Sequence, residues 1–252
     1  AVSYAIVAYR TAYMKRHYPR EYMAALLTSV LDNSAKVGEY IAECREMGIK
    51  LLPPDVNESD ANFTVAGENL RYGLVAIKGI GWGVINSLVA EREQNGPFRS
   101  FEDFCRRMAG RDLNRRTLEN LIRAGAFDSM GYKRRALMQI AAQVLESINQ
   151  AERDNISGQM DLFGGFESQS DRVSQTIAIP EVQEYSSREI MAMEKETTGI
   201  YLSGHPMDDY RSYLKNTHVV PIGALMEEES RYQDDQIISV AGIVQSVKMK
   251  TT

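Results

Sequence analysis

The sequence predicts a mainly α-helical protein: a bundle of short helices with one small β-hairpin, and strands at its end. Three observations lead to this prediction. Apolar residues recur at helical spacing through most of the chain. Glycine and proline interrupt that pattern at short intervals, which keeps the helices short. From residue 236 onward the chain has the density of β-branched residues that is typical of strands.

The composition is that of an ordinary globular protein. The chain has 252 residues, of which 44% are hydrophobic and 25% charged, enough for a sizeable core. No apolar run approaches the ~18 residues of a membrane span, and nothing resembles a secretory signal. Cys44 and Cys105 lie in helical patterns, and no Cys/His cluster accompanies them. We therefore expect buried free thiols in a reducing cytosol, with no metal site.

The first 60 residues read as three helices. The first covers residues 1–17, the second begins at Pro19, and the third runs from an N-cap at Ser34 to Gly48. Their aromatic and methionine side chains are expected in the core. The Leu-Leu-Pro-Pro run at 51–54 then breaks the helical pattern and opens an extended connection.

A β-hairpin and further short helices follow. Residues 63–65 and 70–74 flank a Gly-Glu-Asn turn at 67–69, a pattern typical of a hairpin. Beyond it, Ser100 and Asn114 are candidate N-caps of two helices. Residues 132–153 predict one longer amphipathic helix.

The last hundred residues alternate between irregular and regular structure. Residues 154–182 are rich in Ser, Gln, Gly and Asp, which predicts a linker. A helix is predicted over 187–198, a short one from Pro206, and strands from 236. The chain starts without an initiator methionine and stops within the strand-like run, which indicates a piece of a larger protein.

The strongest local motif is the run Leu74–Ala90, in which a short helix meets a Gly-Ile-Gly turn that opens a second helix. Gly79 and Gly81 are expected to allow positive φ and the close approach of a phosphate. The helix N-terminus beyond them favours an anion, and Lys78 adds charge. Ile77, Ile80, Val84 and Leu88 would pack behind the turn. The motif resembles the helix-hairpin-helix family of DNA-backbone binders; the alternative is an ordinary glycine turn.

Basic residues cluster just after this motif. Between Arg99 and Arg135 there are ten basic and five acidic residues, a local charge of +5 in a chain whose net charge is −5. Residues 113–127, followed by a turn and Lys133–Arg135, read as a second, degenerate hairpin. A solvated helical surface is the alternative. The residues expected to bind duplex DNA, without sequence preference and with strong salt dependence, are Lys78, Gly79, Ile80, Gly81, Arg115, Arg116, Lys133, Arg134 and Arg135.

A short apolar peptide lies within the predicted linker. Its residues are Gln159, Met160, Asp161, Leu162 and Phe163, with glycines on both sides. Two adjacent large hydrophobic side chains on a linker need a partner that buries them. The peptide is therefore expected to dock into a partner's groove, the alternative being a chance sequence.

No catalytic constellation is visible. The three histidines, His17, His205 and His218, are scattered. The acidic clusters 208–209 and 227–229 lack partners that would make a metal site, so solvated surface is the better interpretation.

Several motifs occur together in one order. They are 4–10 with 15–19, 43–48 with 52–57, the glycine turn, 113–116, 125–128, the 159–163 peptide and 198–206. With this series the chain resembles, along essentially its whole length, the alpha subunits of bacterial DNA polymerase III, the C-family replicative polymerases. Each motif is modestly specific, whereas the ordered series is very specific.

The resemblance implies the following organisation. Residues 1–60 would end a fingers domain, 61–153 would be the helix-hairpin-helix region that contacts duplex DNA, and 154–183 a linker whose peptide binds the sliding clamp. Residues 184–235 would be a helical connector, and 236–252 the start of an OB-type β domain, truncated here. The palm aspartates, where Mg²⁺ is expected, would lie upstream, so this piece should not polymerise DNA alone.

The resemblance also implies partners and location. These are duplex DNA, the sliding clamp and other replisome subunits in the bacterial cytoplasm, with no membrane. Two alternatives belong to other classes. One is a clamp-associated repair nuclease or ligase, which would need a catalytic lysine or carboxylate cluster that the sequence does not offer. The other is a complete non-enzymatic scaffold, which the missing methionine disfavours.

Overall fold

The computed structural model describes the chain except residues 1, 32, 159–176, 216, 221, 226–231, 234, 245–246, 248 and 250–252. It divides into two compact units, Ala1–Leu202 and Ser203–Thr252. The fold is mainly α-helical, as predicted, with one small sheet. The Gln159–Phe163 peptide lies outside the described residues.

Three helices open the first unit: α1 (Val2–His17), α2 (Pro19–Ser29) and α3 (Ser34–Glu46). Pro19 occupies the first turn of α2, as predicted. The N-cap of α3 is Asn33 rather than Ser34, because the Asn33 side chain accepts a hydrogen bond from the N–H of Lys36. Gly48, with φ of +74°, ends the helix.

The expectation that the aromatic and methionine side chains of these helices lie in the core is correct for α2 and wrong for α1. Met23 of α2 is fully buried. On α1, Tyr4 is 84% and Tyr9 70% exposed. The helical spacing of the apolar residues does predict α1, but a helix buries its apolar face only where another element covers it.

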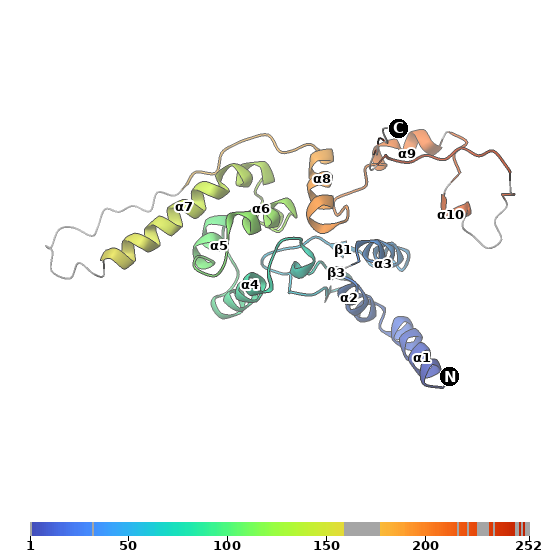
Figure 1. Ribbon diagram of the computed structural model, residues 1–252, viewed down its shortest axis with the longest axis horizontal. Helices are drawn as coiled ribbons and strands as arrows, with labels where there is room; N and C mark the ends of the chain where they lie inside the picture. Colours follow the sequence, from blue (N-terminus) through green and yellow to red (C-terminus); the bar gives the residue numbers. More distant parts are fainter. Residues whose placement is uncertain are drawn as a thin grey trace. The chain divides into compact units, whose positions relative to one another are not determined.

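The sheet has the strand order β1-β3-β2, and Figure 1 labels β1 and β3 within the first unit. Strands β2 (Thr64–Ala66) and β3 (Asn69–Arg71) form the predicted antiparallel hairpin, with Gly67 at φ +62° in its turn. Strand β1 (Leu51–Leu52) pairs parallel with β3. The sequence pattern indicated an extended segment here and no pairing partner.

The next segment folds into η1 (Leu74–Ala76), α4 (Trp82–Asn95), α5 (Phe101–Arg107), α6 (Arg115–Arg123), η2 (Asp128–Met130) and α7 (Arg134–Gly158). Ser100 and Asn114 are N-caps, as predicted: each side chain accepts from a backbone N–H three residues on, at 3.1 and 2.9 Å. Edge-to-face contacts of Phe127 with Phe101 and Phe104 join the chain after α6 to α5.

Helix α8 (Ser187–Thr198) completes the first unit within its predicted bounds. Ser186 and Glu189 form a reciprocal capping box at its start. Gly199, with φ of +80°, stops it. The helix packs against α6, so it belongs to the same body as α6 and α7.

The second unit contains η3 (Asp208–Tyr210), α9 (Arg211–Lys215) and α10 (Ile222–Leu225). Among its described residues, the β-branched run after 236 forms a single parallel bridge, between Val219 and Ser239, in place of the expected strands. Ile237 is 98% and Val244 76% exposed. Strand formation needs a paired neighbour as well as the right side chains.

Candidate nucleic-acid interface

The Gly-Ile-Gly turn joins η1 to α4. Gly79 has φ of +77°, in the left-handed region, and an added Cβ would lie 2.8 Å from Nδ2 of Asn120. Gly81 has φ of −81° and open space around it, so the expectation of positive φ is right for Gly79 and wrong for Gly81. Gly81 instead serves as the extended N-cap residue of α4.

The hydrophobic side of the turn is as predicted. Ile77, Val84 and Leu88 are each at most 5% exposed, and Ile80 packs against the same core. The Ile80 side chain therefore supports the turn from behind. Trp82, at the first position of α4, is 54% exposed, and the sequence pattern alone had not singled it out.

The outer side of the turn offers unused donors. Within the described residues, the backbone N–H groups of Gly79 and Gly81 donate no hydrogen bond. The 14-residue helix α4 begins at the next residue, and its first N–H groups and dipole carry partial positive charge. The turn therefore presents donors to an approaching anion.

Helix α6 lies beside the turn and widens this surface. Asn120 Nδ2 donates to the carbonyl oxygen of Lys78 at 2.9 Å. A pocket of about 390 Å³ opens beside this contact, between the turn and α6. Its lining includes Lys78, Gly79, Arg116, Asn120, Arg123 and Glu196. Arg123 is one of the ten basic residues of the sequence cluster, but neither it nor Asn120 was among the residues expected to bind DNA, because only the fold brings α6 against the turn.

The basic residues expected to bind DNA divide into two groups. The exposed side chains of Lys78 and Arg116 make no hydrogen bond or ion pair with any residue that the structure describes, and both line the pocket. Arg115 pairs with Glu119 at 2.7 Å, and this hydrogen bond and charge raise the pKa of Arg115. Lys78 and Arg116 are therefore the cations available to a ligand here.

The three cations at the start of α7 hold the structure together. Lys133 Nζ donates to the carbonyl oxygen of Val182 at 3.0 Å. Arg135 lies 3.8 Å from Glu189 and stacks over the Tyr185 ring. Together with Arg134, these contacts fix the returning chain against α7.

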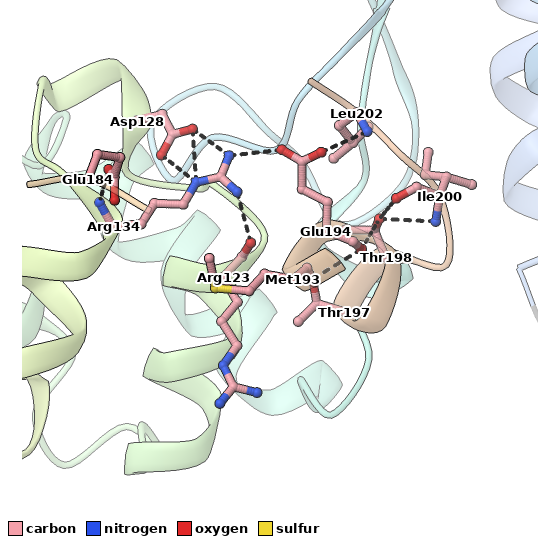
Figure 2. Close-up of polar contacts among 10 residues, drawn as sticks. All are labelled: Arg123, Asp128, Arg134, Glu184, Met193, Glu194, Thr197, Thr198, Ile200 and Leu202. Carbon is pink, nitrogen blue, oxygen red and sulfur yellow. Dashed lines mark hydrogen bonds and ion pairs between the residues drawn. The ribbon is translucent and has the colours of Figure 1, made fainter. Parts of the chain in front are cut away.

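Arg134 is buried inside a polar cluster (Figure 2). Its guanidinium lies 2.6 Å from Asp128 and 3.0 Å from Glu194, which is itself 1% exposed. Glu194 also accepts from the N–H of Leu202 at 2.9 Å. Burial alone would lower the pKa of Arg134, but the hydrogen bonds and charges of Asp128 and Glu194 raise it. Arg134 stays charged and holds α8 in place, so it is not free to contact DNA.

The end of α8 reaches the glycine turn itself. The N–H of Lys78 donates to the carbonyl oxygen of Thr197 at 2.8 Å. The hydroxyl of Tyr72 donates to the carbonyl oxygen of Thr198 at 3.0 Å. Burial raises the pKa of Tyr72, so the hydroxyl remains a donor throughout the ordinary pH range. Terminal carbonyls of α8 are thus satisfied by residues on either side of η1.

The described part of the chain offers neither a metal-binding cluster nor a membrane-spanning helix. It contains no group of three or more His, Cys, Asp or Glu side chains placed to hold a metal ion. None of its helices is both long and apolar enough to cross a lipid bilayer.

Comparisons with known proteins agree with this geometry. Residues 48–137 match the model of the helix-hairpin-helix motif. A DNA polymerase III subunit alpha of Mycobacterium tuberculosis is 37% identical over 99% of this chain and 21% of its own length. Those of Borreliella burgdorferi and Escherichia coli are 36% identical over 100% of this chain, and over 22% and 21% of their own lengths. The chain thus spans about a fifth of these relatives.

Proposed function

We propose a function on the premise that the chain belongs to the family of the DNA polymerase III alpha subunits, as a segment about a fifth of the relatives' length. In this proposal the chain holds duplex DNA and tethers the polymerase to its sliding clamp. The DNA would be held through its phosphates, without sequence preference. Both contacts would favour processive synthesis. The synthesis itself, and the Mg²⁺ that it uses, would belong to the rest of the longer protein.

One observation carries the DNA-binding part of the proposal. Lys78 and Arg116, two cations without a partner among the described residues, line one pocket together with Gly79, and the backbone N–H groups of Gly79 and Gly81 in the same turn are unused donors. A phosphodiester group accepts hydrogen bonds and carries one negative charge, so it matches both sets of groups. Donors and cations that contact phosphate oxygens read no base edge, so this contact carries no sequence preference.

The test is a duplex-binding titration at several salt concentrations. Removal of one phosphate-binding cation should reduce the slope of log K against log salt by about 0.9. We expect the double variant Lys78→Ala, Arg116→Ala to bind more weakly and with a slope shallower by nearly 2. The control is Arg106→Ala, which removes an exposed cation already paired with Glu102. Equal slopes for the double variant and the control would refute the DNA contact.

The clamp-binding part rests on the peptide Gln159–Phe163. Burial of Leu162 and Phe163 contributes roughly 1.5–3 kcal/mol each, and ordering such a segment costs about 2–5 kcal/mol. The net affinity is therefore weak. It becomes useful when DNA bound by the same chain raises the effective clamp concentration toward ~mM, provided that the clamp encircles that DNA.

This part is tested by binding to the isolated sliding clamp. We expect the double variant Leu162→Ala, Phe163→Ala to lose binding. Phe166→Ala is the matched control, because it removes a phenyl group from the same segment outside the peptide. Unchanged clamp affinity in the double variant would refute the clamp assignment and would not affect the proposed DNA contact.

A further inference from the structure

One cation in the pocket is already occupied by an anion of the chain itself. Nη1 of Arg123, on α6, lies 3.4 Å from Oε1 of Glu196, on α8. The two residues are 73 positions apart in the sequence. Both line the 390 Å³ pocket that also contains Lys78 and Arg116. The Glu196 carboxylate therefore lies in the same pocket in which the proposed function places a DNA phosphate.

The geometry makes this ion pair easy to exchange. Glu196 is 69% exposed and Arg123 32% exposed, and an exposed ion pair is weak because water and salt screen it. The contact joins a single nitrogen and a single oxygen, whereas a phosphate can engage the arginine fork with two oxygens. An incoming phosphodiester can therefore replace the carboxylate at Arg123.

The backbone of Glu196 is held in position beside the pocket. The carbonyl of the next residue, Thr197, accepts from the N–H of Lys78, and Glu194 is fixed by Arg134. The main chain of Arg123 is fixed as well, since its carbonyl oxygen accepts from Arg134, while its side chain points away from that cluster (Figure 2). Only the two side-chain ends are free to exchange partners.

We infer that Arg123 is a further phosphate ligand for duplex DNA and that Glu196 masks it. This inference rests on the proposed function and deepens it. The carboxylate competes with the DNA backbone for Arg123 and so lowers the affinity of the pocket. Holding DNA loosely lets a polymerase move along it, which gives the competition a use.

The variant Glu196→Gln tests the masking. The shape is kept and the side chain is largely exposed, so folding is preserved; thermal unfolding checks this. We expect two- to fivefold tighter binding of a short DNA duplex, the range for removal of one exposed ion pair. The slope of log K against log salt should steepen by at most about 0.9, the value reached if Glu196 withholds Arg123 from the phosphate entirely in the unaltered chain.

Two further variants separate masking from a general effect of charge. Glu102→Gln removes a carboxylate from an exposed ion pair outside the pocket. Arg123→Gln should weaken DNA binding more in the Glu196→Gln background than in the unaltered chain. Only in that background is Arg123 free of its carboxylate partner before DNA binds. Such non-additivity is the signature of a direct pair.

The outcomes distinguish the two proposals. If Glu196→Gln binds DNA like Glu102→Gln, while Lys78→Ala, Arg116→Ala still weakens binding, the masking is refuted and the DNA contact stands. If the Lys78, Arg116 double variant also binds normally, both are refuted. Additive effects of Arg123→Gln and Glu196→Gln would likewise overturn the inference.

Discussion

The N–H of Lys78 donates a 2.8 Å hydrogen bond to the carbonyl oxygen of Thr197, so the glycine turn and the last turn of α8 are joined through the backbone. The side chain of the same lysine lines the pocket beside Arg116. The position of the Lys78 backbone relative to α6 is fixed separately, because Asn120 donates a hydrogen bond to the Lys78 carbonyl oxygen. Three segments distant in the sequence therefore set the geometry of the turn.

The two glycines of the turn should respond differently to substitution. Gly79→Ala places a side chain at φ +77° and against Asn120, so we expect a loss of about 1–2 kcal/mol in the free energy of unfolding. Gly81→Ala meets open space at φ −81° and should be neutral or stabilising by up to about 1 kcal/mol. Urea unfolding measures both.

Duplex binding then gives the second readout for Gly81→Ala. If DNA is held as proposed, its phosphate approaches the Gly81 backbone closely, so we expect the added methyl group to lower the affinity although the fold is intact. Normal affinity in this variant would show that no phosphate comes close to Gly81.

Loss of the buried carboxylate should be costly. Glu194→Gln leaves the guanidinium of Arg134 buried with Asp128 as its remaining ionic partner. We expect a loss of about 3 kcal/mol in unfolding free energy, the low end for a broken buried pair. Glu102→Gln, in an exposed pair, should change it by about 1 kcal/mol or less. Similar values for both variants would contradict the structural role of Glu194.

The cysteines should be almost inert in the folded chain. Burial raises the pKa of Cys44 to about 11 and that of Cys105 to about 12. The thiolate is the reactive form, so alkylation at pH 8 should be at least about 100-fold slower than in denaturant. The rate should rise with pH toward these values. Rapid labelling of Cys105 in the folded chain, read by mass spectrometry, would contradict its burial.

The capping box of α8 should respond to acid. Two hydrogen bonds lower the pKa of Glu189: mainly the one from the Ser186 side chain, and to a smaller extent the one from the Ser186 backbone N–H. A lowered folded pKa stabilises the fold above the ordinary glutamate pKa of about 4.3, and the effect is lost as pH falls through the folded value. In an NMR titration, Ser186→Ala should raise the pKa of Glu189, whereas Ser187→Ala should not.

Local signals in the sequence predicted local structure. Ser100 and Asn114 cap helices because a short polar side chain reaches an N–H three residues on, wherever the helix lies in the fold. The turn of the hairpin at Gly67 and the bounds of α8 were found for similar reasons. Such interactions depend on neighbours in the chain.

Contacts between distant segments were beyond the sequence pattern. Arg134 looked like part of a basic surface, and only its neighbours Asp128 and Glu194 make it a buried residue. The conformation of Gly81 depends on its role as an N-cap, and the strand β1 on its pairing with β3. The sequence pattern thus located the glycine turn but not which of the surrounding cations remain free.

The docking of α8 has a further consequence for the integrity of the chain. Arg134 and Glu194, with Lys78 and Thr197, hold together parts that precede residue 158 and parts that follow residue 177. None of these contacts requires a continuous backbone between the parts. A protease cut within that interval should leave two pieces that comigrate in a native gel and separate only in denaturant. The same interval would accept an inserted tag or fluorescent reporter without disturbing the glycine turn.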